Sequence, residues 1–189
     1  MEEPMTNTRK MATIAILSAV SFLLMYLKFP LIPTASFLEI DFSIVPVLLG
    51  LVVLDLKSAF GILLIRSVLK IIFNNAGPST LIGMPMNIIA VGIFVLAMAM
   101  IWKKNPSVKH YLLASVLGTV GLTLGMLVMN YFYAIPVYAA FANFDIEAIL
   151  GTSTYLMTMV APFNLLQGIL FSLVFYIIFR AVEPILKKV

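Results

Sequence analysis

Long apolar runs separated by short polar segments make up most of this sequence. A helix that crosses a bilayer needs about 20 mostly apolar residues, and several of the runs approach that length. The pattern predicts helices over residues 11–27, 44–54, 58–73, 81–102, 111–135 and 155–181. The run at 44–54 is short, and only Asp55-Leu56-Lys57 separates it from the next one. One broken hairpin at this point, which would give five spans, is therefore an open alternative to six.

The composition is typical of an integral membrane protein. Of the 189 residues, 62% are hydrophobic and 11% are charged, whereas a soluble domain carries about 25% charged residues. A chain of this length cannot hide so much apolar surface from water. We predict a single all-α transmembrane domain over residues 1–189. No small-residue cleavage site closely follows the first apolar run, which favours an anchor over a signal peptide.

Lysine and arginine are distributed unevenly among the segments that separate the runs. If the chain crosses the membrane six times, nine of the twelve fall on one side: Arg9, Lys10, Lys57, Lys103, Lys104, Lys109, Arg180, Lys187 and Lys188. The positive-inside rule assigns this side to the cytoplasm. We therefore expect six transmembrane helices with both termini inside, and outer loops at 29–43, 74–80 and 136–154. This distribution also accounts for the net charge of +4 without a nucleic-acid partner.

Several classes of function lack the residues that they require. The chain has no cysteine and one histidine, His110, so we expect no disulfide framework and no metal centre. It contains no glycine-rich phosphate loop, so the chain cannot hydrolyse ATP by itself. It offers no nucleophile paired with a base. We therefore expect neither an enzyme nor a protein with a cofactor.

Polar side chains within the apolar runs predict a ligand site. Lys70, Asn87, Asn130, Asn164 and Gln167 fall in the outer halves of their helices, roughly 5–18 Å below the outer ends. Such residues usually face the interior of a bundle. Because amides both donate and accept hydrogen bonds, the set favours a neutral, polyhydroxylated or heterocyclic ligand. The alternatives are that each Asn bonds a neighbouring helix and that Lys70 extends to the headgroups.

In the stretch FLEIDFSIVP, residues 37–46, the part Phe37–Ser43 would lie above this polar set as part of a lid. Pro46 fits the first turn of a helix, where a missing N–H costs little, and Asp41 or Ser43 is suited to cap that helix. Glu39 is then the better candidate for ligand contact. Aromatic and methionine residues also gather toward the outer ends, where they form an interfacial belt or, in part, line an apolar slot for a flat ring: Phe42, Met84, Met86, Met129, Tyr131, Tyr133 and Tyr155.

Two other features leave alternatives open. Ala15-x-x-x-Ala19 in the first run forms a small-residue face that lets another helix approach closely. That helix belongs either to this chain or to a partner. Arg66 lies one turn deeper than Lys70 and has no acidic residue four positions away. It would pair with a backbone carbonyl or with Asp55.

The chain resembles the substrate-binding S components of energy-coupling factor (ECF) vitamin transporters, and among them the riboflavin-specific members. The resemblance covers essentially the whole chain. It depends on the size of the chain, on the six expected spans, on the small-residue face of the first helix and on three stretches: Leu38-Glu39-Ile40-Asp41-Phe42-Ser43-Ile44-Val45-Pro46, Leu69-Lys70 and Gly83-x-x-x-Asn87. Where the family often has an acid after this glycine, the chain has Met84, which argues against an acidic contact there.

The resemblance implies a function and partners. It implies a subunit of the bacterial cell membrane that binds riboflavin near the extracellular face with high affinity, as a transported ligand rather than a cofactor. Ala15 and Ala19 would dock on the transmembrane coupling protein EcfT, and two cytoplasmic ATPases would supply the energy. The expected riboflavin contacts are Glu39, Phe42, Lys70, Met84, Asn87, Asn130, Tyr133, Asn164 and Gln167. The alternatives are an S component for another vitamin and a stand-alone secondary transporter.

Overall fold

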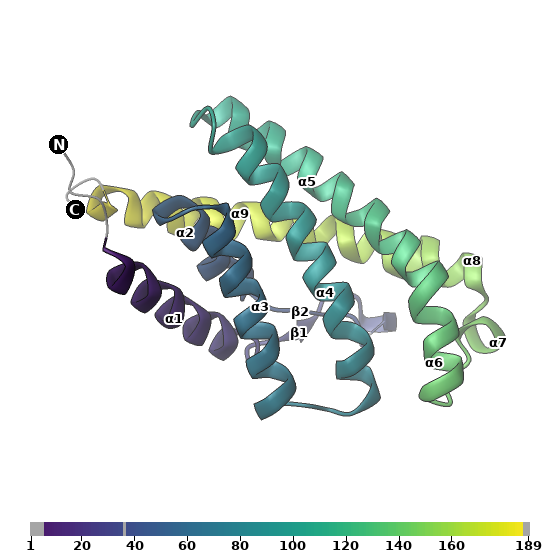
Figure 1. The fold of residues 1–189 in the computed structure, drawn as a ribbon. Helices are drawn as coiled ribbons and strands as arrows, with labels where there is room; N and C mark the ends of the chain where they lie inside the picture. Colours follow the sequence, from purple (N-terminus) through teal and green to yellow (C-terminus); the bar gives the residue numbers. More distant parts are fainter. Residues whose placement is uncertain (1–5, 36, 187–189) are drawn as a thin grey trace.

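The computed structural model describes residues 6–35 and 37–186, and within them the protein is almost entirely helical (Figure 1). Lys187 and Lys188, which entered the charge argument, lie outside the described residues. The first helices are α1 (Asn7–Leu24), α2 (Ile44–Val53), α3 (Leu56–Phe73) and α4 (Pro78–Ala97), which the π-helical η2 (Met98–Trp102) extends. Then follow α5 (Val108–Met129), η3 (Asn130–Ala134), α6 (Ile135–Phe141), α7 (Ile146–Leu150), α8 (Thr152–Thr154), η4 (Tyr155–Val160) and α9 (Ala161–Leu186).

Between α1 and α2 the chain forms a small ribbon. Strands β1 (Phe29–Pro30) and β2 (Glu39–Ile40) pair antiparallel, with Phe29 opposite Ile40, and the 3-10 turn η1 (Pro33–Ala35) lies between them. Ile40 is fully buried and belongs to the main hydrophobic core. The loop predicted at 29–43 is therefore attached to the helices through a buried side chain.

The helix count differs from the prediction. Counted as continuous stretches, the described residues contain seven helices rather than six, because α7 forms within the segment expected to be a loop. At the suspected hairpin, α2 and α3 are separate helices: the backbone of Leu54 leaves helical geometry, and the Asp55 carboxylate accepts from the Ser58 backbone N–H at 2.7 Å. A side-chain acceptor at this position begins a new helix.

Within the described part of the chain, three helical stretches are long and apolar enough to cross a membrane: Pro78–Trp102, Val108–Phe141 and Thr152–Ile185. The π-helical segments make them continuous, so two of them extend past the predicted ends. α2 is apolar but has ten residues. α3 contains three cations, Lys57, Arg66 and Lys70, which lower its apolar character. The membrane nature of the chain agrees with these helices, whereas six spans and the orientation of the termini stay predictions.

The short α2 lies at the centre of the bundle, in contact with α1, α3 and α9. Ile44, Val47, Leu48 and Leu51 on α2 are fully buried. This explains why its sequence is apolar on all sides. The start of α1 and the end of α9 lie at one end of the bundle, and α6, α7 and α8 lie toward the other (Figure 1).

α5 crosses α9 at Gly168, where the two helices approach closely. A Cβ added at Gly168 would lie 2.6 Å from Cγ2 and 2.7 Å from Cβ of Thr119. Gly168→Val therefore forces the helices apart, and we expect it to destabilise the protein by about 1–3 kcal/mol. A thermal melt in detergent should show Tm lower by about 2–12 °C. Gly61→Val in α3 is the matched control, since no described heavy atom lies within 4 Å there; equal melts of the two variants would contradict the prediction.

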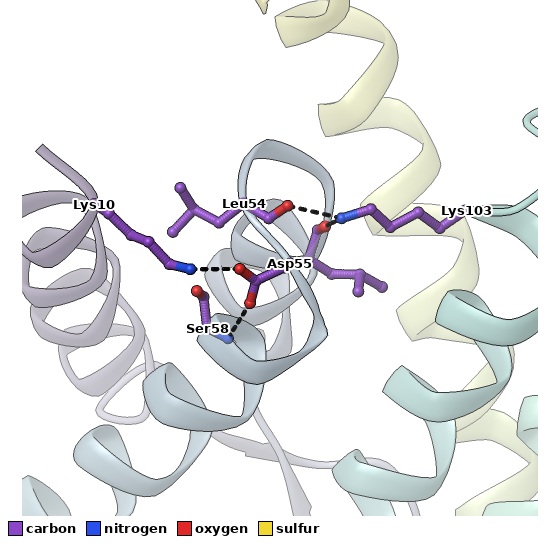
Figure 2. Close-up of polar contacts among 6 residues, drawn as sticks. Lys10, Leu54, Asp55, Ser58 and Lys103 are labelled. Carbon is purple, nitrogen blue, oxygen red and sulfur yellow. Dashed lines mark hydrogen bonds and ion pairs between the residues drawn. The ribbon is translucent and has the colours of Figure 1, made fainter. Parts of the chain in front are cut away.

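A polar cluster joins three elements where α2 meets α3 (Figure 2). The Lys10 ammonium bonds the Asp55 carboxylate at 2.5 Å, and Lys103 donates to the Leu54 carbonyl at 2.9 Å. Lysine at this position satisfies a free carbonyl at the end of α2. The Lys10 hydrogen bond, followed by the Ser58 N–H, holds the pKa of Asp55 far below its usual value. Burial lowers the pKa of Lys103. The cluster fixes α1 and the end of η2 to the α2–α3 junction.

Candidate ligand-binding cavity

A cavity of about 680 Å³ opens at the other end of the bundle, where α3 ends and α4 begins. This volume is within the range of small-molecule sites, about 300–1,000 Å³. Seven of the nine predicted site residues line it: Glu39, Lys70, Met84, Asn87, Asn130, Asn164 and Gln167. They come from β2, α3, α4, η3 and α9. The structure therefore gathers into one cavity the polar residues that the sequence places at similar depth.

Phe42 and Tyr133 are not among the described residues that line the cavity, so their contact with a ligand stays a prediction. The Phe42 ring packs 5.9 Å from the Phe29 ring, against the main core. Tyr133 lies in the π-helical η3, whose wider turn changes the face on which each residue falls. Asn130 and Ala134, which flank Tyr133 in this turn, are buried.

Other aromatic residues line the cavity instead. Tyr138 of α6, Tyr155 of η4 and Phe163 of α9 contribute to the wall, and Phe37 of the loop stacks on Tyr155 with ring centroids 6.3 Å apart. Phe37 and Tyr138 lie in the predicted outer loops 29–43 and 136–154, where a large hydrophobic side chain is a signal for a buried position, whereas Tyr155 and Phe163 lie in the predicted helix 155–181. Their assignment to the cavity needs the tertiary fold, because η4 and α6 bring them there.

Asn130 and Asn164 are buried, and each donates its amide N–H to the backbone carbonyl four residues earlier, Met126 or Val160, at 2.7 Å. The Asn130 carboxamide oxygen also accepts from the Tyr155 hydroxyl at 2.7 Å. Asn130 thus connects two segments of the cavity wall, as the interhelical alternative expects. Asn164 makes no such bond in the part of the chain that the structure describes, so its oxygen is available to the cavity.

Arg66 is fully buried, and the structure overturns both expected partners. Asp55 bonds Lys10 and Ser58 at the other end of α3. The Arg66 guanidinium instead donates to the Ser43 hydroxyl and, at 2.7 Å, to the carboxamide oxygen of Asn87. It therefore connects the start of α2 with the cavity wall.

The loop at 29–43 closes over one side of the cavity. Lys28 forms an ion pair with Glu39, and both side chains line the cavity. Lys28 therefore has a role in the loop rather than that of a membrane-interface residue alone. Glu39 already has a cationic partner, so a ligand would meet a paired carboxylate.

The Asp41 carboxylate accepts a backbone hydrogen bond just before the start of α2. It accepts from the Ser43 backbone N–H at 2.8 Å and from the Ser43 hydroxyl. Ser43 itself makes no side-chain capping bond, so of the two candidates Asp41 serves the backbone here. Pro46 is the third residue of α2, within its first turn.

The small-residue face of α1 is not covered by any other part of residues 6–35 and 37–186. Ala15 and Ala19 are exposed, whereas Ser18 and Ser21 are buried toward the bundle. The Ser21 hydroxyl donates to the Ser43 carbonyl at 2.5 Å. α1 therefore packs on its serine side and leaves the alanine side open.

Comparison with known proteins agrees with this architecture. The family described as "ECF transporter, substrate-specific component" matches residues 9–179. The chain belongs to this family. It is therefore a component of a membrane transporter and not an enzyme, and it uses no cofactor. ECF S components work with the other subunits of an ECF transporter, so partners of that kind are expected for this chain.

Individual relatives cover nearly the whole chain. The riboflavin transporter RibU of Streptococcus thermophilus is 58% identical over 97% of this chain and 87% of its own length. RibU of Lactococcus lactis subsp. cremoris is 44% identical over 92% and 93%. A solved structure described as the S component of a bacterial ECF transporter superposes with a TM-score of 0.79 at 27% identity, covering 96% of this chain and 99% of that one.

Proposed function

We propose that this chain is the riboflavin-binding S component of an ATP-driven ECF uptake transporter. The observation that carries the proposal is the cavity of about 680 Å³, whose wall combines amides with aromatic and methionine side chains. A flat ring with a polyhydroxylated tail needs both kinds of surface. The relatives named riboflavin transporter support this choice of ligand.

The lining residues divide into two groups. Asn87, Asn164, Gln167 and Lys70 would bond the polar ring edge and the hydroxyls of the tail. Four others would flank the ring, because methionine and aromatic side chains adapt to flat apolar surfaces: Met84, Tyr138, Tyr155 and Phe163. Glu39 with Lys28, and Asn130 with Tyr155, would hold the wall in place. Phe42 and Tyr133 are not assigned to the ligand.

In the membrane, we place both termini and the α2–α3 junction on the cytoplasmic side of six spans. Lys10 and Lys103 meet at that junction (Figure 2), and Lys57 is the second residue of α3, as the positive-inside rule requires of a cytoplasmic segment. The cavity then opens toward the extracellular side of a bacterial cell membrane. A single domain over residues 1–189 fits this arrangement.

For energy coupling, we propose docking on EcfT, which two cytoplasmic ATPases drive. The exposed Ala15 and Ala19 on α1 support this proposal, because small residues let a partner helix approach closely. This surface is separate from the cavity, so ligand binding and docking can be tested independently.

Titration of the purified protein with riboflavin tests the proposal. Burial of the ring between aromatic side chains should quench flavin fluorescence at micromolar or lower ligand, with a one-to-one endpoint. A panel of other vitamins in the same assay should fail to compete. Absence of quenching at micromolar riboflavin would contradict the proposal, and preferential competition by another vitamin would assign the chain to that vitamin.

A further inference from the structure

Arg66 is the largest fully buried side chain among the described residues, and its partners are neutral. It donates to Ser43 and to Asn87, and Ser43 in turn donates to Asp41. None of the ion pairs found in residues 6–35 and 37–186 includes Arg66. A buried arginine is costly unless its donors are satisfied. Its position between the loop and the cavity wall therefore suggests a role beyond packing.

The bond to Arg66 fixes the orientation of the Asn87 carboxamide. A guanidinium group has donors and no acceptor, so the atom of Asn87 that meets it at 2.7 Å must be the oxygen. The amide nitrogen Nδ2, with its two N–H donors, then occupies the other branch of the side chain. Asn87 lines the cavity, and among the described residues this nitrogen has no hydrogen-bond partner.

Asn164 has the opposite polarity. Its Nδ2 donates to the Val160 carbonyl of its own helix at 2.7 Å, which leaves the oxygen for the cavity. Two amides of the same chemical type therefore differ in what they offer. Asn87 presents donors and Asn164 presents an acceptor, and in each case a neighbouring group of the protein determines the orientation.

We infer that Arg66 is a positioning residue that selects for a ligand acceptor, a carbonyl oxygen or ring nitrogen, at Asn87. Asn164 correspondingly takes a ligand N–H or hydroxyl. This inference rests on the proposed function and specifies how its site distinguishes ligands. A flavin ring carries both kinds of group at its polar edge. If a ligand presents a donor to the fixed N–H groups of Asn87, both donors stay unpaired, and such a ligand binds much more weakly.

Asn87→Asp tests the orientation with little change of shape. The new carboxylate still accepts from Arg66, but it offers the ligand an acceptor in place of a donor. The Kd for riboflavin should rise about tenfold to a hundredfold. The Tm should not fall, because the hydrogen bond from the Arg66 guanidinium becomes an ion pair with a carboxylate. Ser67→Ala is the control: Ser67 is buried beside Arg66, bonds the Leu63 carbonyl and does not line the cavity, so Kd should stay within about twofold.

A double-mutant cycle tests whether Arg66 acts through Asn87. Arg66→Gln should raise Kd in the parent but change it by less than about twofold in the Asn87→Ala background. Additive losses in the cycle would show a merely structural Arg66 and overturn the inference. If Arg66→Gln does not fold, the Asn87→Asp result decides.

The parent protein is titrated beside each variant. If the parent protein quenches flavin fluorescence but the Kd of Asn87→Asp stays within about threefold of the parent value, the inference is overturned and the proposed function stands. A lower Tm for this variant would have the same consequence. No quenching by the parent contradicts the proposed function, and the inference with it.

Discussion

Gly83→Leu is expected to weaken riboflavin binding by about a hundredfold while leaving the fold intact. Gly83 lines the cavity, and a Cβ added there would meet no described heavy atom within 4 Å. The folded chain therefore has room for a larger side chain, and that room is the space proposed for the ligand. Gly83 and Asn87 are four residues apart in α4, so a leucine at 83 would lie over the Asn87 amide.

The measurement compares fluorescence titrations and melts of two leucine variants. Gly61→Leu is the control, because Gly61 also has no described heavy atom within 4 Å but does not line the cavity. Both variants should melt at or above the Tm of the parent, since glycine is a poor helix former. Gly83→Leu alone should lose affinity. Unchanged binding by Gly83→Leu would show that the ligand lies elsewhere, and equal losses in both variants would show a general effect of the substitution.

The sequence predicts the long helices well and their ends less well. The apolar runs that became α4, α5 and α9 are long enough to identify by length alone. The continuation through η3 into α6 and the start of the last helix at α8, before η4, were missed, because π-helical turns have no pattern in hydrophobicity. η2 ends at Trp102, where the predicted run ends. α7 was missed since its five residues lie in a segment that resembles a loop by length and composition.

The expected depth of a residue along its helix was enough to predict which polar side chains line the cavity. It was not enough to predict which aromatic side chains do so. Asn87, Asn130 and Asn164 could be predicted because a buried amide in a membrane helix needs partners inside the bundle. Phe42 and Tyr133 could not be separated from Tyr155 and Phe163, since aromatic side chains suit the core, the interface and a ligand equally. The partners of Arg66 depend on how α2, α3 and α4 meet, which no local pattern specifies.

The second large effect concerns docking. Ala15→Trp together with Ala19→Trp should reduce riboflavin uptake by cells at least about tenfold, because bulky side chains prevent close approach of a partner helix. Both alanines are exposed in this chain, and neither lines the cavity. The variant should therefore fold normally and bind riboflavin with the Kd of the parent. The expected combination is full binding without uptake.

Co-purification of EcfT with the tagged chain measures docking directly, beside cellular uptake and the fluorescence titration. Val120→Trp on α5 is the control, since Val120 is also exposed, at 44%, but lies on another helix. It should retain uptake, and EcfT should co-purify with it as with the parent. If the double tryptophan variant still transports riboflavin, docking uses another surface. If it loses riboflavin binding as well, the alanine face supports the fold of this chain. A surface that serves only docking does not contact the cavity, because no described residue of α1 lines it and the lining begins at Met25, just after the helix.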